Sequence, residues 1–297
     1  MRQDGTPYFI AEVSSNHAQD LKRCLAFVDA AAACGADAVK FQLFKIDEMF
    51  APEILTRSAN HRARKAWELP VSFLPEIAER AAVKGVDFVC TPFYLDAVAE
   101  LEPFVSSFKI ASYELVWDDL LIACARTRKP VILSTGMADL GEITHAADVL
   151  RGIGARDVTL LHTVSAYPTP VREANLAAMR TISRATGLPC GWSDHTVSPA
   201  VIYRAAYGFN APAIEFHLDL DATGAEYAAG HCWLPGQIAP VIATIREGAR
   251  ADGDGRKIAV PSEAPDRVWR ADPSDGLRPF KSERVKWAQS LIGAAAE

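Results

Sequence analysis

The chain has 297 residues, of which 49% are hydrophobic, and it carries a formal net charge of −6. This length is sufficient for one α/β barrel or for two smaller domains with buried cores. The acidic balance argues against general binding to nucleic acid or to anionic membranes, because both require a basic surface. No apolar run reaches the roughly 18–20 residues of a membrane span.

The six cysteines are scattered along the sequence and form no Cys-x-x-Cys pair. Several lie in apolar runs, which predicts reduced core thiols rather than disulfides or zinc ligands. The first seven residues are polar and do not resemble a signal peptide. We therefore expect a cytoplasmic protein.

One module recurs along the chain: a short apolar strand, a polar cluster and an amphipathic helix. Strands are expected at 8–14, 38–44, 87–93, 107–112, 130–136, 158–165, 188–195 and 213–220. Helices are expected at 19–34, 71–84, 95–101, 117–127, 141–152, 173–186, 198–208 and 236–250. Near-continuous apolar strands are typical of a parallel sheet buried on both faces. Eight alternations predict a (β/α)8 TIM barrel, with a doubly wound open sheet as the alternative.

Two segments depart from this module, after the second and eighth expected strands. We expect 45–70 and 221–235 to be extended loops, the first lying over the mouth of the barrel. His231, in the second loop, is interpreted either as an ordinary loop histidine beside a packing tryptophan or as a residue that covers the substrate or supplies a further polar contact. The catalytic barrel is expected to span 1–255. Residues 256–297 are expected to form a C-terminal extension that packs on it and ends in a helix at 282–295.

Two histidines stand at the ends of consecutive expected strands, His195 and His217. Two imidazoles placed in this way can converge on one metal ion and leave coordination positions open for a substrate. The alternative interpretation is a pair of ordinary histidines that cap strand ends.

Two lysines, Lys40 and Lys109, lie inside apolar strands, where an unpaired ammonium costs several kcal/mol to bury. Each lysine either pairs with a carboxylate such as Glu12 or Glu215, or binds an anionic ligand carrying phosphate or carboxylate. Neutral donors for such an anion follow neighbouring strands, at Ser112, Ser134, Thr135 and Gly136. A Schiff-base lysine is the main mechanistic alternative.

The sequence resembles the sialic acid synthase (N-acetylneuraminate synthase) family in an ordered set of stretches. They are IAEVSSNH (10–17), GADAVKFQ (35–42), TPF (91–93), FKIAS (108–112), LSTGM (133–137), LLHTVSAYPTP (160–170), WSDHT (192–196) and IEFH (214–217). Together they run from the first expected strand to the eighth. The family condenses phosphoenolpyruvate with an aldose to give a nonulosonic, 2-keto-3-deoxy sugar acid and phosphate.

The resemblance implies a role for each matching residue. The phosphoenolpyruvate-binding positions would be Lys40, Thr91, Lys109, Ser112, Ser134, Ser165 and Ser193. His195 and His217 would bind a divalent metal, usually Mn²⁺, with Mg²⁺ or Co²⁺ as substitutes. Glu12 and Glu215 would be the active-site carboxylates. Gln42 and Tyr167 would face the sugar.

The chain also departs from the family pattern. Typical members carry a small C-terminal antifreeze-like domain that reaches across a homodimer, and we expect no such domain before Glu297. Ser165 stands where many members have Asn, and the loop at 218–235 differs from the usual one. The phosphoenolpyruvate and metal half therefore matches better than the aldehyde half, and the acceptor is either N-acetylmannosamine-like or another hexose or hexosamine. A Schiff-base aldolase and a non-catalytic barrel subunit in surface-polysaccharide assembly are the alternative functions.

Overall fold

The computed structural model describes residues 4–294, with side chains to residue 289. The chain forms two compact units, Met1–Arg250 and Ala251–Glu297. Among the described residues, no helix is long and apolar enough to cross a membrane.

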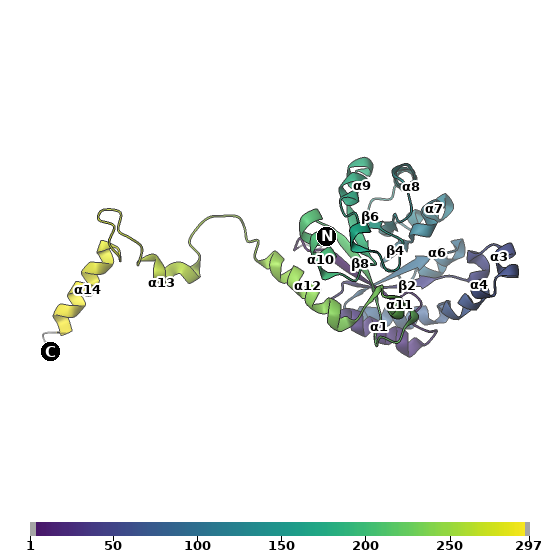
Figure 1. Cartoon of the computed structure of the whole chain (residues 1–297), viewed down its shortest axis with the longest axis horizontal. Coiled ribbons are helices and arrows are strands. Elements are labelled where there is room, and N and C mark those ends of the chain that lie inside the picture. Colours follow the sequence, from purple (N-terminus) through teal and green to yellow (C-terminus); the bar gives the residue numbers. More distant parts are fainter. Residues whose placement is uncertain (1–3, 295–297) are drawn as a thin grey trace. The chain divides into compact units, whose positions relative to one another are not determined.

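The first unit is a closed barrel of parallel strands surrounded by helices (Figure 1). Its strands are β1 (Tyr8–Glu12), β2 (Ala38–Leu43), β3 (Asp87–Pro92), β4 (Ser107–Ile110), β5 (Val131–Ser134), β6 (Val158–Thr163), β7 (Cys190–Asp194) and β8 (Ala213–Leu218). Each strand pairs with the next, and β1 pairs with β8. This closure confirms the predicted (β/α)8 barrel and excludes the open sheet. The observed strands are shorter than expected because their last predicted residues already belong to the loops that follow.

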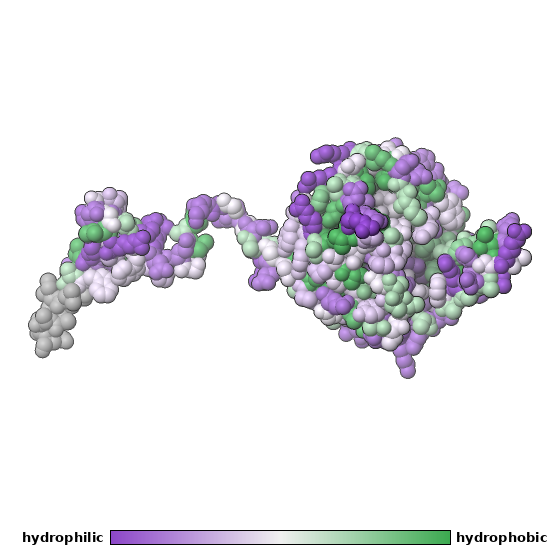
Figure 2. Space-filling model, viewed as in Figure 1, coloured by the Kyte–Doolittle hydropathy of each residue, from purple (hydrophilic) through white to green (hydrophobic). Residues whose placement is uncertain are grey.

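Amphipathic helices cover the outside of the strands. The main ones are α1 (Leu21–Ala33), α5 (Leu74–Lys84), α6 (Leu95–Leu101), α7 (Asp118–Arg126), α8 (Leu140–Gly152), α9 (Ala178–Thr186), α10 (Pro199–Tyr203) and α12 (Pro235–Arg250). Side chains cap the N-terminal ends of several of these helices. At α8, Asp139 and Glu142 form a capping box, which satisfies backbone N–H groups at the start of the helix. In Figure 2, hydrophobic residues on the barrel face in view lie interspersed among hydrophilic ones. The apolar sides of the helices pack on the strands in one large core.

The inside of the barrel contains a small apolar layer that supports the polar groups above it. Its members are Ile10, Ala38, Val89, Ile132, Leu161 and Ala213. Side chains alternate along a strand, so the next inward-facing position after Ile10 is Glu12, at the C-terminal end of β1. The register places Glu12 beside Lys40 of β2 on one side and His217 of β8 on the other. Three predicted site residues therefore stand side by side.

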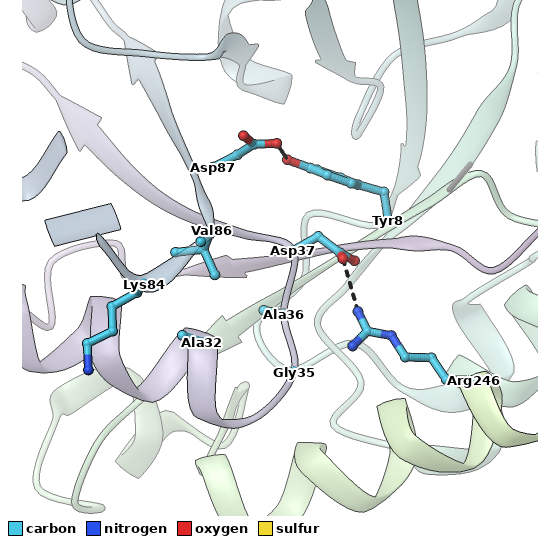
Figure 3. Close-up of a pocket in the computed structure, with 10 residues that line it drawn as sticks. Tyr8, Ala32, Gly35, Ala36, Asp37, Lys84, Val86, Asp87 and Arg246 are labelled. Carbon is cyan, nitrogen blue, oxygen red and sulfur yellow. Dashed lines mark hydrogen bonds and ion pairs between the residues drawn. The ribbon is translucent and has the colours of Figure 1, made fainter. Parts of the chain in front are cut away.

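The opposite, N-terminal end of the barrel has its own polar network around a cavity of about 420 Å³ (Figure 3). The Tyr8 hydroxyl donates to Asp87, and Arg246 of α12 donates to Asp37 at 3.0 Å. Asp37 also accepts from the backbone N–H of Phe9 at 2.9 Å. These bonds tie α12 to the starts of β1, β2 and β3. In a barrel of this type, such contacts at the N-terminal face contribute to stability.

The segment 45–70, expected as an extended loop after β2, folds mostly into short helices. It contains α2 (Ile46–Met49), α3 (Pro52–Arg57), α4 (Ala59–Ala63) and a 3-10 turn (Arg64–Trp67). Ser58 caps α4, and Glu68 accepts a hydrogen bond from the backbone N–H of Ile46 at 2.7 Å. Each helix is too short to be stable alone and depends on such tertiary contacts. Figure 1 shows α3 and α4 at the edge of the barrel.

The expected loop at 221–235 also contains regular structure. A short helix, α11 (Ala225–Ala229), is followed by a two-residue strand, β9 (Cys232–Trp233), which pairs with β8. The indole N–H of Trp233 donates to Asp194 at the end of β7, at 3.1 Å. This loop is therefore fixed to two barrel strands.

The second unit contains a 3-10 turn (Pro261–Glu263), α13 (Ala264–Arg267) and α14 (Lys281–Ala294). The predicted helix at 282–295 is confirmed up to residue 294, and residue 295 lies outside the described part of the chain. Within the unit, the backbone N–H of Phe280 donates to Val268 at 3.0 Å, and the rings of Trp269 and Trp287 meet edge to face. The packing of 256–297 on the barrel stays a prediction.

Candidate active site

A cavity of about 1200 Å³ opens at the C-terminal ends of the barrel strands. It is the face on which TIM-barrel enzymes carry their active sites. All the predicted site residues line it except Thr91, Thr135, Gly136 and Ser165. Thr91 lies directly behind Lys40, whose Nζ donates to its hydroxyl at 3.4 Å, and Ser165 lies beside Gly136. The structure therefore gathers the whole predicted set in and around one cavity.

Lysines and glutamates form a buried network at the floor of this cavity. Lys40 Nζ lies 2.6 Å from Glu12 Oε2 and 3.5 Å from Glu215 Oε1, and Lys109 Nζ lies 3.2 Å from Glu215 Oε1. Gln42 Nε2 donates to Glu12 Oε1 at 2.6 Å. The structure thus shows the carboxylate pairing that was one of the two interpretations of the strand lysines. The cluster holds two ammonium groups and two carboxylates, so it is close to neutral as a whole.

Burial and charge act in opposite directions on these groups. Burial lowers the pKa of Lys109 to about 8, although Glu215 acts to raise it. Burial acts in the same direction on Lys40, but the carboxylates of Glu12 and Glu215 outweigh it and the pKa of that lysine is raised. The pKa of Glu215 lies below its ordinary range because the two lysines outweigh its burial. Both lysines are thus mainly protonated near neutral pH.

A pocket of hydroxyl groups lies next to the lysines, around Gly136. The backbone N–H of Gly136 donates to Ser112 Oγ at 3.0 Å. Ser134 Oγ and Ser165 Oγ are buried and have no hydrogen-bond partner among the described residues. A Cβ on Gly136 would lie 2.3 Å from Ser165 Oγ and 2.8 Å from Ser112 Oγ, so any side chain here would displace both hydroxyls. Buried hydroxyls without partners, close to two ammonium groups, are suited to bind the oxygens of an anion.

Two histidines form the other end of the cavity. The His195 and His217 rings lie with centroids 5.2 Å apart. His195 Nδ1 is hydrogen-bonded to the carbonyl of Val164 at 2.8 Å, which leaves Nε2 available. Burial lowers the pKa of His195 to about 3, whereas Glu226 outweighs the burial of His217 and raises its pKa. A neutral, buried and oriented imidazole such as His195 is the form that binds metals.

Three residues of the loop after β8 join this end of the cavity. Glu226 Oε2 lies 3.0 Å from His217 Nδ1 and 3.5 Å from His231 Nε2, and Cys232 Sγ lies 3.8 Å from the same oxygen. Of the two interpretations of His231, the structure favours a polar contact in the site, because its imidazole lines the cavity. Cys232 is a buried free thiol, as predicted for all six cysteines, but it lies beside potential ligands. The available signal was the close spacing of Glu226, His231 and Cys232 in one loop.

Aromatic and apolar side chains form the rim of the cavity. Met49, Phe50 and Trp67 reach it from the segment after β2, and Arg64 stacks on both aromatic rings. Tyr167 stacks on His195 with ring centroids 4.2 Å apart. The prediction that 45–70 lies over the barrel mouth agrees with this arrangement. The rim therefore offers an apolar surface opposite the charged floor.

Comparison with known proteins decides the family. The NeuB family matches residues 27–257. The chain belongs to the NeuB family. It is 38% identical over 264 residues to an uncharacterized protein of Methanocaldococcus jannaschii, covering 87% of this chain and 76% of that protein. It is 37% identical over 269 residues to the N,N'-diacetyllegionaminic acid synthase of Campylobacter jejuni, covering 86% of this chain and 80% of that enzyme.

Solved structures agree with this assignment. The N-acetylneuraminic acid (sialic acid) synthetase of Leptospira borgpetersenii, solved in complex with citrate, superposes with a TM-score of 0.76 at 30% identity. The match covers 88% of this chain and 90% of that one. A truncated 3-deoxy-D-arabino-heptulosonate 7-phosphate synthase of Thermotoga maritima superposes with a TM-score of 0.65 at 16% identity and shows the likeness of fold alone. The predicted resemblance to the sialic acid synthases is confirmed at the level of the family.

Proposed function

We propose that this member of the NeuB family condenses phosphoenolpyruvate with an aldose, in the presence of a divalent metal. The products are a nonulosonic, 2-keto-3-deoxy sugar acid and phosphate. Its relatives include synthases of legionaminic, pseudaminic and sialic acids, which supports an enzyme of the same synthase class. The acceptor is proposed to be an N-acetylmannosamine-like hexosamine or a related hexose.

One observation carries this proposal: the cavity has an anion-binding end and a histidine end. Lys40, Lys109 and the hydroxyls around Gly136 form the first, and His195 and His217 form the second. Phosphoenolpyruvate carries both a phosphate and a carboxylate, which match the ammonium groups and the hydroxyls. An aldehyde at the histidine end would then face the C3 carbon of phosphoenolpyruvate.

The protein's own residues would bind and orient the reactants. Lys109 and Lys40 would hold the phosphate and carboxylate, and the hydroxyls of Ser134 and Ser165 would donate to the remaining oxygens. In the reaction, a bond forms between C3 of phosphoenolpyruvate and the aldehyde carbon. Water then adds to C2 and the C2–O bond to phosphate breaks. Glu12 and Glu215, fixed by the lysines, are placed to exchange the protons of the water and of the new hydroxyl.

The residues at the histidine end fit a divalent metal. His195 and His217 are buried, and each has its Nδ1 held by a hydrogen-bonded oxygen, as is usual for metal-binding imidazoles. His231 Nδ1, nearby, is buried without a partner among the described residues. We propose His195 and His217 as ligands, with Mn²⁺, Mg²⁺ or Co²⁺ as the ion. When bound, the ion would supply a Lewis acid that polarises the aldehyde.

A Schiff-base aldolase is the second candidate, and the lowered pKa of Lys109, about 8, favours it. Against it, Lys109 is paired with Glu215 at 3.2 Å, and this pairing keeps the amine protonated. Pyruvate followed by borohydride should leave the chain unlabelled. Reductive labelling of Lys109 or Lys40, with activity that survives chelation, would support the aldolase instead.

Phosphate release tests the proposal. The purified chain is incubated with phosphoenolpyruvate, Mn²⁺ and a panel of N-acylated hexosamines and plain hexoses. Phosphate should appear only when all three components are present, together with an equal amount of 2-keto-3-deoxy acid. No release with any aldose would overturn the proposal.

We also propose a cytoplasmic enzyme, because the six free cysteines suit a reducing compartment.

A further inference from the structure

We propose that Glu226, His231 and Cys232 bind a metal ion together with Nδ1 of His217, so that this chain holds a thiolate-containing metal centre in addition to the ion that Nε2 of His195 and of His217 would face. The inference goes beyond the proposed function and does not rest on it, because the binding of this ion is tested without catalysis. It also gives a chemical reason for Glu226, His231 and Cys232 to lie together in the loop after β8, which the pair of His195 and His217 alone does not.

The backbone brings Cys232 to His217. The two-residue strand β9 pairs in parallel with the end of β8, and Cys232 is the register partner of His217. The backbone N–H of Asp219 donates to the Trp233 carbonyl at 2.9 Å and fixes this register. Side chains at paired positions of neighbouring parallel strands point to the same face. The thiol therefore stands next to the imidazole, at the edge of the cavity.

The rest of the loop delivers the other two donors. Glu226 lies in the first turn of α11, and Gly230 ends that helix in the left-handed region, with φ +92°. The turn at Gly230 brings His231 back toward Glu226. Ser15 holds the other oxygen of Glu226, Oε1, through its hydroxyl at 2.9 Å, so that Oε2 points at the cluster. Sequence-distant elements thus place this carboxylate.

The distances match those of a metal centre. One donor atom from each of His217, Glu226, His231 and Cys232 lies within 4.8 Å of all the others. From Glu226 Oε2, the distances to His217 Nδ1, His231 Nε2 and Cys232 Sγ are 3.0, 3.5 and 3.8 Å. Tetrahedral bonds of about 2.0–2.3 Å place neighbouring donors about 3.3–3.8 Å apart. Small side-chain movements are therefore sufficient to close the four atoms around one ion.

The cluster is costly to bury without an ion. His231 is 6% exposed and its Nδ1 has no partner among the described residues. Cys232 is 2% exposed, and its Sγ lies 3.8 Å from Glu226 Oε2. A divalent cation would displace the proton of the Cys232 thiol on binding. It would then neutralise the negative charges of both the Cys232 thiolate and the Glu226 carboxylate. Asn16, which donates to Cys232 Sγ at 3.7 Å and to the Leu218 carbonyl at 3.1 Å, would support the thiolate.

The donor set indicates the class of metal. Imidazole, carboxylate and thiolate together suit Zn²⁺, Co²⁺ and Fe²⁺, whereas Mg²⁺ and Mn²⁺ prefer oxygen ligands. Affinity alone does not test the proposal, because most nitrogen and oxygen sites also bind Zn²⁺ more tightly than Mn²⁺. A sulfur–metal bond has its own signal, since thiolate-bound Co²⁺ shows a sulfur-to-metal charge-transfer absorption in the near ultraviolet.

The experiment titrates the intact, metal-free chain with Co²⁺ and records its absorption spectrum. We expect a charge-transfer band that saturates at one equivalent. Cys232→Ser should lose this band, while Cys190→Ser, a matched change of another buried thiol at the start of β7, should keep it. His231→Ala should weaken Co²⁺ binding, whereas His145→Ala, on the exposed face of α8, should not. Circular dichroism shows whether each variant is folded.

Absence of the band in the unsubstituted protein, or its survival in Cys232→Ser, would overturn the inference. Because the unsubstituted protein is measured first, a variant that fails to fold does not remove the test. Failure of the inference and failure of the proposed function are distinguishable. Phosphate release with Co²⁺ but without the band would contradict the thiolate centre alone. A band without phosphate release from any aldose would contradict the function alone.

Discussion

Lys109 and Glu215 form a buried ion pair across the barrel, from β4 to β8, with Nζ and Oε1 3.2 Å apart. Each side chain is almost inaccessible to solvent, at 3% and 4%. A pair buried to this degree is weak support for stability, because desolvation offsets much of the attraction. Its position at the floor of the cavity indicates a functional use instead: an incoming anion can compete with Glu215 for the ammonium group.

Lys109→Met should separate stability from binding. It leaves Glu215 with Lys40 at 3.5 Å and the Ser193 hydroxyl at 3.4 Å, and should destabilise the fold by about 3 kcal/mol. The double variant Lys109→Met/Glu215→Gln should recover most of that loss but still bind phosphoenolpyruvate at least about tenfold more weakly. Urea unfolding and calorimetric titration measure the two effects. Lys84→Met, at the opposite end of the barrel, is the control, and equal loss of binding there would contradict the assignment.

Gly136→Ala should block the anion pocket. The added methyl would lie within 3 Å of the hydroxyls of both Ser112 and Ser165, where no real Cβ fits. We expect loss of phosphoenolpyruvate binding with Co²⁺ binding retained, because the histidine end is untouched. Gly152→Ala, in α8, meets no atom within 4 Å and should leave both unchanged. Normal binding in Gly136→Ala would show that the hydroxyl pocket does not hold the anion.

Glu114 should make the stability depend on pH. Burial raises the pKa of this carboxyl from its ordinary value of 4.5 to about 7, although Lys109 acts to lower it. Between these two values the folded chain keeps a proton that the unfolded chain has released. The free energy of unfolding from this group therefore falls as pH rises, by at most about 1.4 kcal/mol per pH unit. The contribution is complete below pH 4.5 and lost above about pH 7.

Unfolding by urea at several pH values measures this effect. Glu114→Gln should flatten the fall between pH 4.5 and 7, while Glu79→Gln, on the exposed face of α5, should not change it. Identical pH profiles for Glu114→Gln and the unsubstituted chain would show that the carboxyl is not buried in its neutral form.

Ligands should stabilise the fold by mass action. A ligand present at 100 times its Kd adds about 2.7 kcal/mol to the free energy of unfolding. Phosphoenolpyruvate and a divalent metal should each raise the melting temperature. EDTA should reverse only the increase that the metal causes. The shift with phosphoenolpyruvate should be absent in Lys109→Met. An unchanged melting temperature at saturating ligand would count against the site.

The barrel was predictable because its signal is repeated. Eight apolar strands and eight amphipathic helices each show a hydrophobic pattern, so an error in the prediction of one element does not change the predicted fold. The position of the site followed from topology, since parallel strands bring their C-terminal ends to one face. Thus Glu12, Lys40 and His217, far apart in the sequence, could be expected together. The pairing of Lys40 and Lys109 with carboxylates was foreseen as one of two options.

The segments between these modules were not predictable in the same way. The helices of 46–67 depend on tertiary contacts such as the hydrogen bond from the Ile46 backbone N–H to the Glu68 carboxylate. The local helix propensity of the sequence does not predict such contacts. The strand β9 has two residues, too few for any periodicity, yet it places Cys232 beside His217. The close spacing of Glu226, His231 and Cys232 was a signal in the sequence, but their approach to His217 could be found only in the structure.

Carbon-carbon bond formation tests the central claim most directly. The chain is incubated with phosphoenolpyruvate labelled with ¹³C at C3, an N-acylated hexosamine and a divalent metal, and the label is followed by NMR. We expect the vinyl signal of C3 to be replaced by that of a ring methylene in a sugar acid, with one phosphate released for each. Phosphate release with the label in the methyl group of pyruvate, or an unchanged vinyl signal, would contradict the account.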